Sequence, residues 1–423
     1  MTTVSAKTAS AEETAHLSLQ LGRLLLMAGA DTAQVGTSVE RFAASLGYES
    51  HLLVSYEALT LTVISSGEFR TKVGPHVEGR TVDMSAIRAL NRIVDDAAGD
   101  QMDIAALHQR LDGLEKFQPH YPRWLVACAL GLTAASLSWI FGGDGPVFVT
   151  AFIAGMLAIL VQQQLRSWHV HPLAVTFLSA LTGGCAGGLG MRIHPAAAPA
   201  LCLISPGMIL VPGVPLINGL YDALHDNISL GLARLVSALL VVTAIALGLF
   251  TATVLTGIGI PTSGATPLLP IGQDAFFSAL ATIGYVFLFN VISRVAFACI
   301  ICGLCSHALR TALMHLGFDI AIGTIIGSMA AGFLADLFAQ RLKAPPATFA
   351  FPGVVAMVPG SYAFRAVVAG LQIMHSAGAS SASLVAQTMS LVLSTILLTG
   401  AIVIGLAIPL SLRLTGRALS HSS

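Results

Sequence analysis

The chain has 423 residues, carries equal numbers of acidic and basic side chains, and is 55% hydrophobic but only 10% charged. Its zero net charge and the lack of a long basic run exclude a typical nucleic-acid-binding protein. The charges are unevenly placed, because residues 1–120 contain 25 charged side chains (10 basic and 15 acidic) and residues 121–423 only 17, with no glutamate. The second part has too little charge to cover a water-facing surface, so composition predicts a soluble domain followed by a membrane domain.

The soluble part begins with two predicted helices. Apolar residues recur at helical spacing from about residue 12 to residue 27, and Gly29 is expected to end this first helix. Asp31 or Thr32 can cap a second helix, which is expected to stop at Gly47.

Strands and two further helices are expected to complete this domain. Residues 48–74 alternate in polarity and are rich in β-branched side chains, which predicts two or three strands. Helices are predicted at about 84–98 and 103–117. The chain starts without the basic and apolar segments of a secretory signal, so residues 1–120 are predicted to form a small α/β domain in the cytoplasm.

The second part contains ten apolar stretches, and about 17–25 apolar residues are needed to cross a bilayer. The fold class expected is therefore a mainly α membrane protein with about ten transmembrane helices. The predicted spans are 123–140, 146–162, 171–190, 196–216, 229–256, 274–292, 294–310, 317–339, 346–371 and 384–412.

The distribution of basic residues predicts how these spans cross a bacterial inner membrane. With the N-terminus in the cytoplasm, most of the basic residues fall at cytoplasmic ends and few fall outside, as the positive-inside rule requires. The C-terminus is then cytoplasmic as well. The cytoplasmic set is Arg123, Arg166, Arg234, Arg294, Arg341, Lys343, Arg413 and Arg417, and the outer set is Arg192 and Arg310.

A proline–glycine double motif occurs twice in the membrane part. Pro206-Gly207 and Pro212-Gly213 form the first copy, and Pro352-Gly353 and Pro359-Gly360 form the second. Proline removes a backbone donor and glycine loosens the chain, so each copy is expected to interrupt a helix at membrane depth. Paired interruptions in corresponding segments of two halves indicate the binding site of a transporter.

The spacing of the two copies predicts an internal repeat. Pro212 and Pro359 lie 147 residues apart, in the fourth and ninth predicted spans. Five spans per half is an odd number, so the two halves, residues 121–260 and 261–423, are expected to run in opposite directions across the membrane. This predicts an inverted repeat whose broken helices meet near the midplane.

The residues at the breaks are the first candidates for substrate binding. Pro212, Gly213, Pro359, Gly360 and Ser361 place backbone groups and one hydroxyl where the helices restart, and helix N-termini favour anions.

Charge in the same spans is costly, so each charged residue there is a candidate by default. Arg365 follows the second break by five residues and can hold a carboxylate bidentately, although a structural or snorkelling arginine is an equal alternative. Asn218 and Asp222 share a helical face after the first break. Asp222 can bind a substrate ammonium or a proton, and the alternative is an interfacial helix cap.

Further polar residues are candidates for coupling or gating. Asn290 and Arg294 lie four apart in the sixth and seventh spans, and Arg294 can pair with Asp336; a solvated membrane edge is the alternative reading. A proton relay needs a group that titrates near neutral pH, and Asp222, Asp336 and His171 are the candidates.

No motif points to enzymatic chemistry. The sequence contains no GxxxxGKS/T phosphate loop, no GxSxG elbow and no HExxH metal motif, so neither an ATP-driven pump nor an embedded hydrolase is expected. Cys299, Cys302 and Cys305 are spaced like part of a cluster-binding run, but they drift around a helix and have no evident fourth ligand. No cofactor and no metal ion are expected.

The sequence resembles the threonine/serine exporter family over essentially its full length. LGRLLLMAGADTAQVGTSVERFAASLG resembles the cytosolic signature of that family, a Gly-Ala-acid-Thr turn followed by a helix. PGMILVPGVPLINGLYDALHDNISLGLARL resembles its fourth and fifth spans, and FNVISRVAFACIICGL and ADLFAQRLKAPPATFAFPGVVAMVPGSYAFRA resemble its second half. Gly36 departs from the pattern, because an acidic residue is expected there. The resemblance implies export of threonine and serine driven by the proton-motive force, and relatives split into two proteins are implicated in succinate export.

Three functions remain open from the sequence. The first is a proton-coupled secondary exporter of threonine and serine, with protons and the lipid bilayer as further partners. The second keeps the architecture and exports a dicarboxylate, which requires two cations such as Arg294 and Arg365. The third is a passive channel, which broken helices in inverted halves disfavour. The sequence leaves the oligomeric state open between a monomer and a homo-oligomer.

Overall fold

The structure, a computed structural model, describes residues 10–421 apart from 66, 80, 100–102, 116–118, 194–197, 261–266 and 376–380. The chain forms two compact units. The first comprises Met1–His120 together with Asn218–Leu235, and the second comprises Tyr121–Ile217 together with Val236–Ser423.

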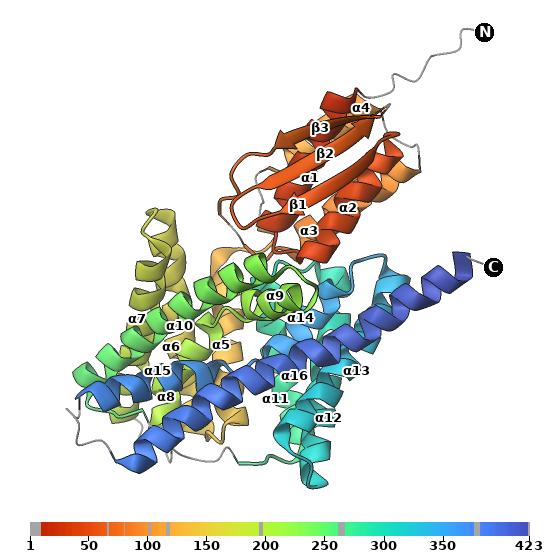
Figure 1. The fold of residues 1–423 in the computed structure, drawn as a ribbon. Helices are drawn as coiled ribbons and strands as arrows, with labels where there is room; N and C mark the ends of the chain where they lie inside the picture. Colours follow the sequence, from red (N-terminus) through yellow and green to blue (C-terminus); the bar gives the residue numbers. More distant parts are fainter. Residues whose placement is uncertain are drawn as a thin grey trace. The chain divides into compact units, whose positions relative to one another are not determined.

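The part of the first unit that precedes Tyr121 has the α/β fold that the sequence predicts. Three strands form an antiparallel sheet in the order β1-β2-β3, and helices pack on one of its faces (Figure 1). The elements are α1 (Ala11–Met27), α2 (Thr32–Ser45), β1 (Glu49–Val54), β2 (Leu59–Ser65), β3 (Glu68–Val73), α3 (Met84–Ala98) and α4 (Ile104–Gly113).

Burial follows the pleat of the central strand. Leu59, Leu61 and Val63 of β2 are buried, and the residues between them are only half-buried. The predicted cap of the second helix is confirmed, because the Asp31 carboxylate accepts a hydrogen bond from the Gln34 amide at 2.8 Å. The fourth helix ends at Gly113, earlier than predicted, and residues 116 and 117 of the predicted helix lie outside the described part.

The prediction of about ten membrane-spanning helices is confirmed. Eight described helices are long and apolar enough to cross a membrane, and two bent pairs bring the number to ten when each pair counts as one span. The eight are α5 (Arg123–Ile140), α6 (Gly145–Ser167), α7 (Pro172–Ile193), α10 (Ile228–Thr256), α11 (Ile271–Leu288), α12 (Ser293–His315), α13 (Ile320–Leu342) and α16 (Ala382–His421).

The two bent pairs contain the proline–glycine motifs. The first pair, α8 (Pro199–Leu210) and α9 (Gly213–Leu224), is bent by 53°, and the second, α14 (Ala347–Val355) and α15 (Gly360–His375), by 48°. Each second helix starts at the second glycine of its motif. The expected interruption therefore occurs at the second proline–glycine of each copy.

The first proline of each copy lies inside a helix instead of ending it. A proline leaves the carbonyl four residues earlier without its helical donor. For Pro352 this is the Thr348 carbonyl, which accepts a hydrogen bond from the Cys299 thiol at 3.3 Å. For Pro206 it is the Cys202 carbonyl, against which the bare backbone of Gly187 packs so closely that a Cβ would overlap it. Neighbouring helices thus cover both freed carbonyls.

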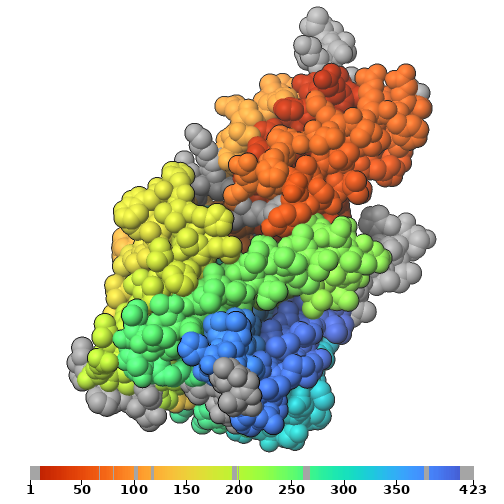
Figure 2. Space-filling view, turned by 60° about the vertical axis from the view of Figure 1, so that its left-hand side comes forward, coloured from red at the N-terminus to blue at the C-terminus, as the bar shows by residue number. Residues whose placement is uncertain are grey.

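The outer surface of the membrane helices is apolar. The side chains of Leu232, Val236, Leu239, Leu240 and Leu247 are exposed along α10, whose green surface lies open in the space-filling view (Figure 2). A row of exposed aliphatic side chains is costly in water and favourable in lipid.

Small residues let α5 and α11 pack with their backbones close together. A Cβ at Gly284 of α11 would overlap the Thr133 hydroxyl and lie 2.6 Å from the Ala129 carbonyl oxygen. Gly284→Ala is therefore expected to cost about 1–3 kcal/mol of stability by overpacking. The check is the unfolding temperature of the purified protein in detergent. Gly272→Ala is the control on the same helix, because a Cβ there meets open space, and an equal temperature for both variants would contradict this packing.

Candidate functional site

The two helix breaks have the same local geometry. The Gly213 amide donates to the Val211 carbonyl at 2.8 Å, and the Gly360 amide donates to the Val358 carbonyl at 2.7 Å. Each is a three-residue turn centred on a proline, whose fixed φ suits such a turn. Both breaks therefore bend the chain by a similar angle immediately before a helix restarts.

The breaks also pack against each other. A Cβ at Gly360 would lie 2.6 Å from Cγ2 of Val211, and one at Gly213 would lie 3.5 Å from Cγ2 of Val358. The valine that precedes each break thus lies over the glycine of the other break. The absence of a Cβ at Gly360 makes the close approach of Val211 possible, whereas the distance at Gly213 is an ordinary van der Waals contact.

A small cavity lies where the breaks meet. Its volume, about 20 Å³ accessible to water, has room for one water molecule and is too small for an amino acid. Two of its lining residues, Ser361 and Tyr285, have a polar side chain, and others belong to the two breaks. The lining residues are Leu137, Phe141, Met208, Val211, Gly213, Tyr285, Val355, Ala356, Val358, Gly360 and Ser361.

Arg365 lies next to this cavity along α15. It follows Ser361 by four residues, so the two share one face of the helix. The Arg365 side chain is buried, with 7% of its surface exposed, and it interacts electrostatically with Tyr362. Of the substrate-site candidates, Gly213, Gly360 and Ser361 line the cavity, the prolines form the turns beside it, and Arg365 lies one turn away.

Asn218 and Asp222 make different contacts, inside the first compact unit. The Asn218 amide donates to the Gly29 carbonyl at 3.0 Å. The Asp222 carboxylate accepts from the Thr32 amide at 3.0 Å and pairs with Arg234 at 3.0 Å. Arg234 in turn donates to the Ala30 carbonyl at 3.0 Å.

These three side chains hold the turn between α1 and α2. The turn is the Gly-Ala-Asp-Thr segment 29–32, and Gly29 has a φ of 89°, which only glycine adopts at low cost. A Cβ there would also lie 2.9 Å from the Thr81 carbonyl oxygen. In the sequence this segment stands out only as a signature. The structure gives it a role as the anchoring point of residues 218–234.

The Asp31 carboxyl at this turn predicts a pH dependence. Burial, and secondarily the Asp222 carboxylate, raises its pKa above the ordinary 3.8, against the opposing effects of the Gln34 amide and Arg234. A raised folded-state pKa means that Asp31 stabilises the fold fully only below about pH 3.8, and that this contribution is lost as the pH rises through the folded pKa.

Asp31→Asn is therefore expected to be at least as stable as the parent protein at neutral pH, because asparagine caps a helix as well as aspartate. Its stability should also vary less with pH in the acid range. Denaturation of the full-length protein at several pH values is the measurement. A loss of more than about 1 kcal/mol at neutral pH would show that the charged carboxylate is favourable.

The gating candidates lie apart from the cavity. Asn290 is buried in a left-handed conformation two residues after α11, with a φ of 51°. Arg294 is exposed in the first turn of α12. Asp336 is half-buried on α13 and accepts a hydrogen bond from Gln340 at 2.8 Å. The relay candidate His171 is exposed at the start of α7.

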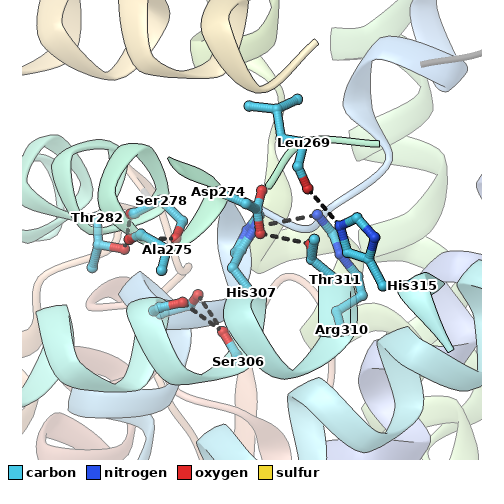
Figure 3. A network of polar contacts seen from close by, with 12 residues as sticks. Leu269, Asp274, Ala275, Ser278, Thr282, Ser306, His307, Arg310, Thr311 and His315 are labelled. Carbon is cyan, nitrogen blue, oxygen red and sulfur yellow. Dashed lines mark hydrogen bonds and ion pairs between the residues drawn. The ribbon is translucent and has the colours of Figure 1, made fainter. Parts of the chain in front are cut away.

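Sequence reasoning missed a buried polar cluster between α11 and α12. Asp274, His307 and Thr311 are buried, and Arg310 joins them (Figure 3). A signal for part of it exists, because His307, Arg310 and Thr311 have the i, i+3, i+4 spacing of one helical face. Their partner Asp274 lies on a different helix, and no local pattern links it to them.

Comparison with known proteins gives relatives for both halves. A protein of Escherichia coli K12 named "Probable succinate transporter subunit YjjP" is 29% identical over 245 residues, 57% of this chain and 94% of that protein. The Mycobacterium tuberculosis "Probable threonine/serine exporter" is 25% identical over 373 residues, 84% of this chain and 69% of that protein. No solved structure matches the chain.

Family models cover most of the sequence. The model described as "Putative threonine/serine exporter" matches residues 16–256, and the one described as "Threonine/Serine exporter, ThrE" matches residues 274–412. The first alone matches more than half of the chain. This multi-pass membrane protein therefore belongs to the threonine/serine exporter family, whose members are membrane transporters and not enzymes.

Proposed function

We propose that this protein is a secondary transporter that exports threonine and serine across a bacterial inner membrane, driven by the proton gradient. The observation that carries the proposal is the meeting of two helix breaks around a small cavity in the membrane part. Broken helices provide free backbone groups at membrane depth, where a polar substrate otherwise finds no partners.

The chemistry around the cavity suits a small amino acid. The N-terminus of α15 and the Arg365 guanidinium can hold a carboxylate together, because helix N-termini and arginine forks both favour anions. The carbonyl groups of the breaks can accept hydrogen bonds from an ammonium group. The Ser361 hydroxyl lines the cavity and can pair with the hydroxyl of threonine or serine.

The cavity in this conformation is too small to hold the proposed cargo. A space for one water molecule admits no amino acid, so transport requires the two breaks to separate. We infer alternating access between two inverted halves, supported by the matching turns, the similar bends of 53° and 48°, and the reciprocal valine–glycine contacts. We propose that both termini lie in the cytoplasm, which the distribution of basic residues supports through the positive-inside rule.

A dicarboxylate is the second candidate cargo, and the name of the Escherichia coli relative, a probable succinate transporter subunit, fits it. Two carboxylates call for two cations. Arg365 is one, and Arg294, the second cation proposed from the sequence, is exposed on α12 and does not line the cavity. This placement favours a cargo with a single carboxylate.

Competition against labelled threonine exchange tests the cargo. Serine should compete, whereas an ester that lacks the carboxylate, a hydroxy acid that lacks the ammonium group, and succinate should compete at least about 10-fold less well. Competition by succinate as strong as that by serine would replace the amino acid with the dicarboxylate. A neutral sugar is the control for leakage.

A further inference from the structure

We propose that His307, set between Asp274 and Arg310, is the proton-binding site that couples transport to the proton gradient. The inference rests on the proposed function and adds to it the atom that takes up the proton. His307 and Asp274 are 1% and 2% exposed, so both lie away from water among the described residues. Intramembrane ionisable groups are costly, which makes a buried pair a functional candidate.

Two side chains share one nitrogen of the imidazole (Figure 3). The Arg310 Nη2 lies 3.1 Å from Nδ1 of His307, and Oδ2 of Asp274 lies 3.5 Å from the same atom. The guanidinium can only donate, so a hydrogen bond from Arg310 requires an accepting Nδ1, which is a neutral imidazole with its hydrogen on Nε2, whereas a hydrogen bond to Asp274 requires a hydrogen on Nδ1. Among the described residues Nε2 has no hydrogen-bond partner although it is buried.

Proton uptake and the arginine contact exclude each other. A proton that binds His307 occupies the Nδ1 lone pair, so the hydrogen bond from Arg310 breaks and a new Nδ1–H faces the Asp274 carboxylate. The charge of the cluster rises by one, and imidazolium and guanidinium repel each other. The Asp274 carboxylate is positioned to accept a hydrogen bond from the protonated imidazole. Its Oδ2 atom also accepts a hydrogen bond from the Thr311 hydroxyl at 2.7 Å, which holds the carboxylate in place.

The neighbouring helices add few other charges. Asp274 faces the imidazole from α11 and Arg310 from α12, and Arg310 also interacts electrostatically with Tyr362 of α15. Helices α13 and α14 also pack against α12. Helix α14 has no titratable residue, and α13 contacts the α12 segment around Ser306 and Arg310 through Gly323 and Gly327. The imidazole is therefore the group here whose ordinary pKa lies within the physiological range.

The cluster is connected to the candidate substrate site through α15. Tyr362, the neighbour of Arg310, directly follows Ser361, which lines the cavity, and it also interacts with Arg365. An Arg310 displaced by a proton on His307 keeps two electrostatic neighbours, Asp274 on α11 and this tyrosine on α15. Protonation therefore biases the position of α15, which is how a bound proton can favour one state of a transporter.

The position along α12 agrees with proton entry from outside. His307 lies eight residues, about 12 Å, before the helix end at His315. With both termini in the cytoplasm, that end faces the outside, from which protons flow during export.

The test compares His307→Gln with His315→Gln, a control on the same helix whose side chain is exposed. In proteoliposomes, His307→Gln should retain threonine counterflow without a gradient and lose the acceleration that a pH gradient gives to net transport. His315→Gln should behave like the parent protein. A His307→Gln variant that still responds fully to the gradient would overturn the assignment. A parent protein without any threonine exchange would instead refute the proposed function.

A titration that does not depend on transport tests the assignment of His307 separately from the proposed transport function. NMR of isotope-labelled histidine in the detergent-purified protein should show one imidazole signal that disappears in His307→Gln and that shifts as the pH is varied. Arg310→Met removes the competing donor, so the titration midpoint should move to higher pH. An unchanged midpoint in Arg310→Met, or no titration of this signal, would contradict competition for Nδ1.

Discussion

Arg365→Ala is expected to reduce threonine and serine export at least about 100-fold while the protein still inserts and folds. Two charge-assisted hydrogen bonds to a carboxylate contribute about 3 kcal/mol or more, which corresponds to that factor. Arg365 is buried one turn beyond Ser361 on α15, so its guanidinium lies on the face that carries the cavity-lining hydroxyl.

Two variants separate the guanidinium from a general effect on folding. Arg365→Lys keeps the charge but loses the planar fork, so an intermediate loss of export is expected. Arg341→Ala removes the same side chain from an exposed position in the last turn of α13 and should export normally. Initial rates of labelled threonine efflux, normalised to the amount of inserted protein, are the measurement. Export by Arg365→Ala at the parent rate would remove this residue from the site.

Gly360→Ala is expected to have the second-largest effect, a loss of export of about 10-fold or more through a steric clash at the breaks. The added Cβ would lie 2.6 Å from Cγ2 and 3.0 Å from Cβ of Val211, a stiff side chain at the other break. Overpacking of this kind typically costs about 1–3 kcal/mol. Because alanine favours a helix over glycine, a lost helical propensity cannot explain reduced transport.

The chain offers both a control and a rescue for this clash. Gly370→Ala changes the same residue type on α15 where a Cβ meets open space, so export should stay at the parent level. Val211→Ala in the Gly360→Ala background removes the clashing methyl groups and should restore part of the export. Equal export by Gly360→Ala and Gly370→Ala would show that the breaks do not need to approach this closely.

Hydropathy predicted the membrane helices well, because crossing a bilayer imposes a length and a composition that each segment carries by itself. The exact helix break was harder to predict. Pro206 and Pro352 satisfy the same local rule as Pro212 and Pro359, yet they lie inside helices. Their freed carbonyls are covered by residues of other helices, and no pattern near a proline reveals such a partner.

In the candidate site, too, local features could be predicted from the sequence, whereas contacts with distant parts of the chain could not. Gly213, Gly360 and Ser361 could be placed at the cavity because their role is a property of the break itself. Asp222 was assigned to substrate or proton binding on the general cost of intramembrane charge. Its actual partners are Arg234 and the Thr32 amide, the latter 190 residues away in the chain. Whether it also takes part in coupling remains a prediction, since a role in binding the turn does not test it.

Counterflow in proteoliposomes tests the central claim most directly. The purified protein is reconstituted, the vesicles are loaded with unlabelled threonine, serine or succinate, and uptake of the labelled compound is followed with and without an imposed pH gradient. Exchange of threonine and serine that responds to the gradient is the predicted result. Exchange of succinate alone would contradict the amino-acid cargo, and the absence of exchange for all three compounds would contradict transport through this site.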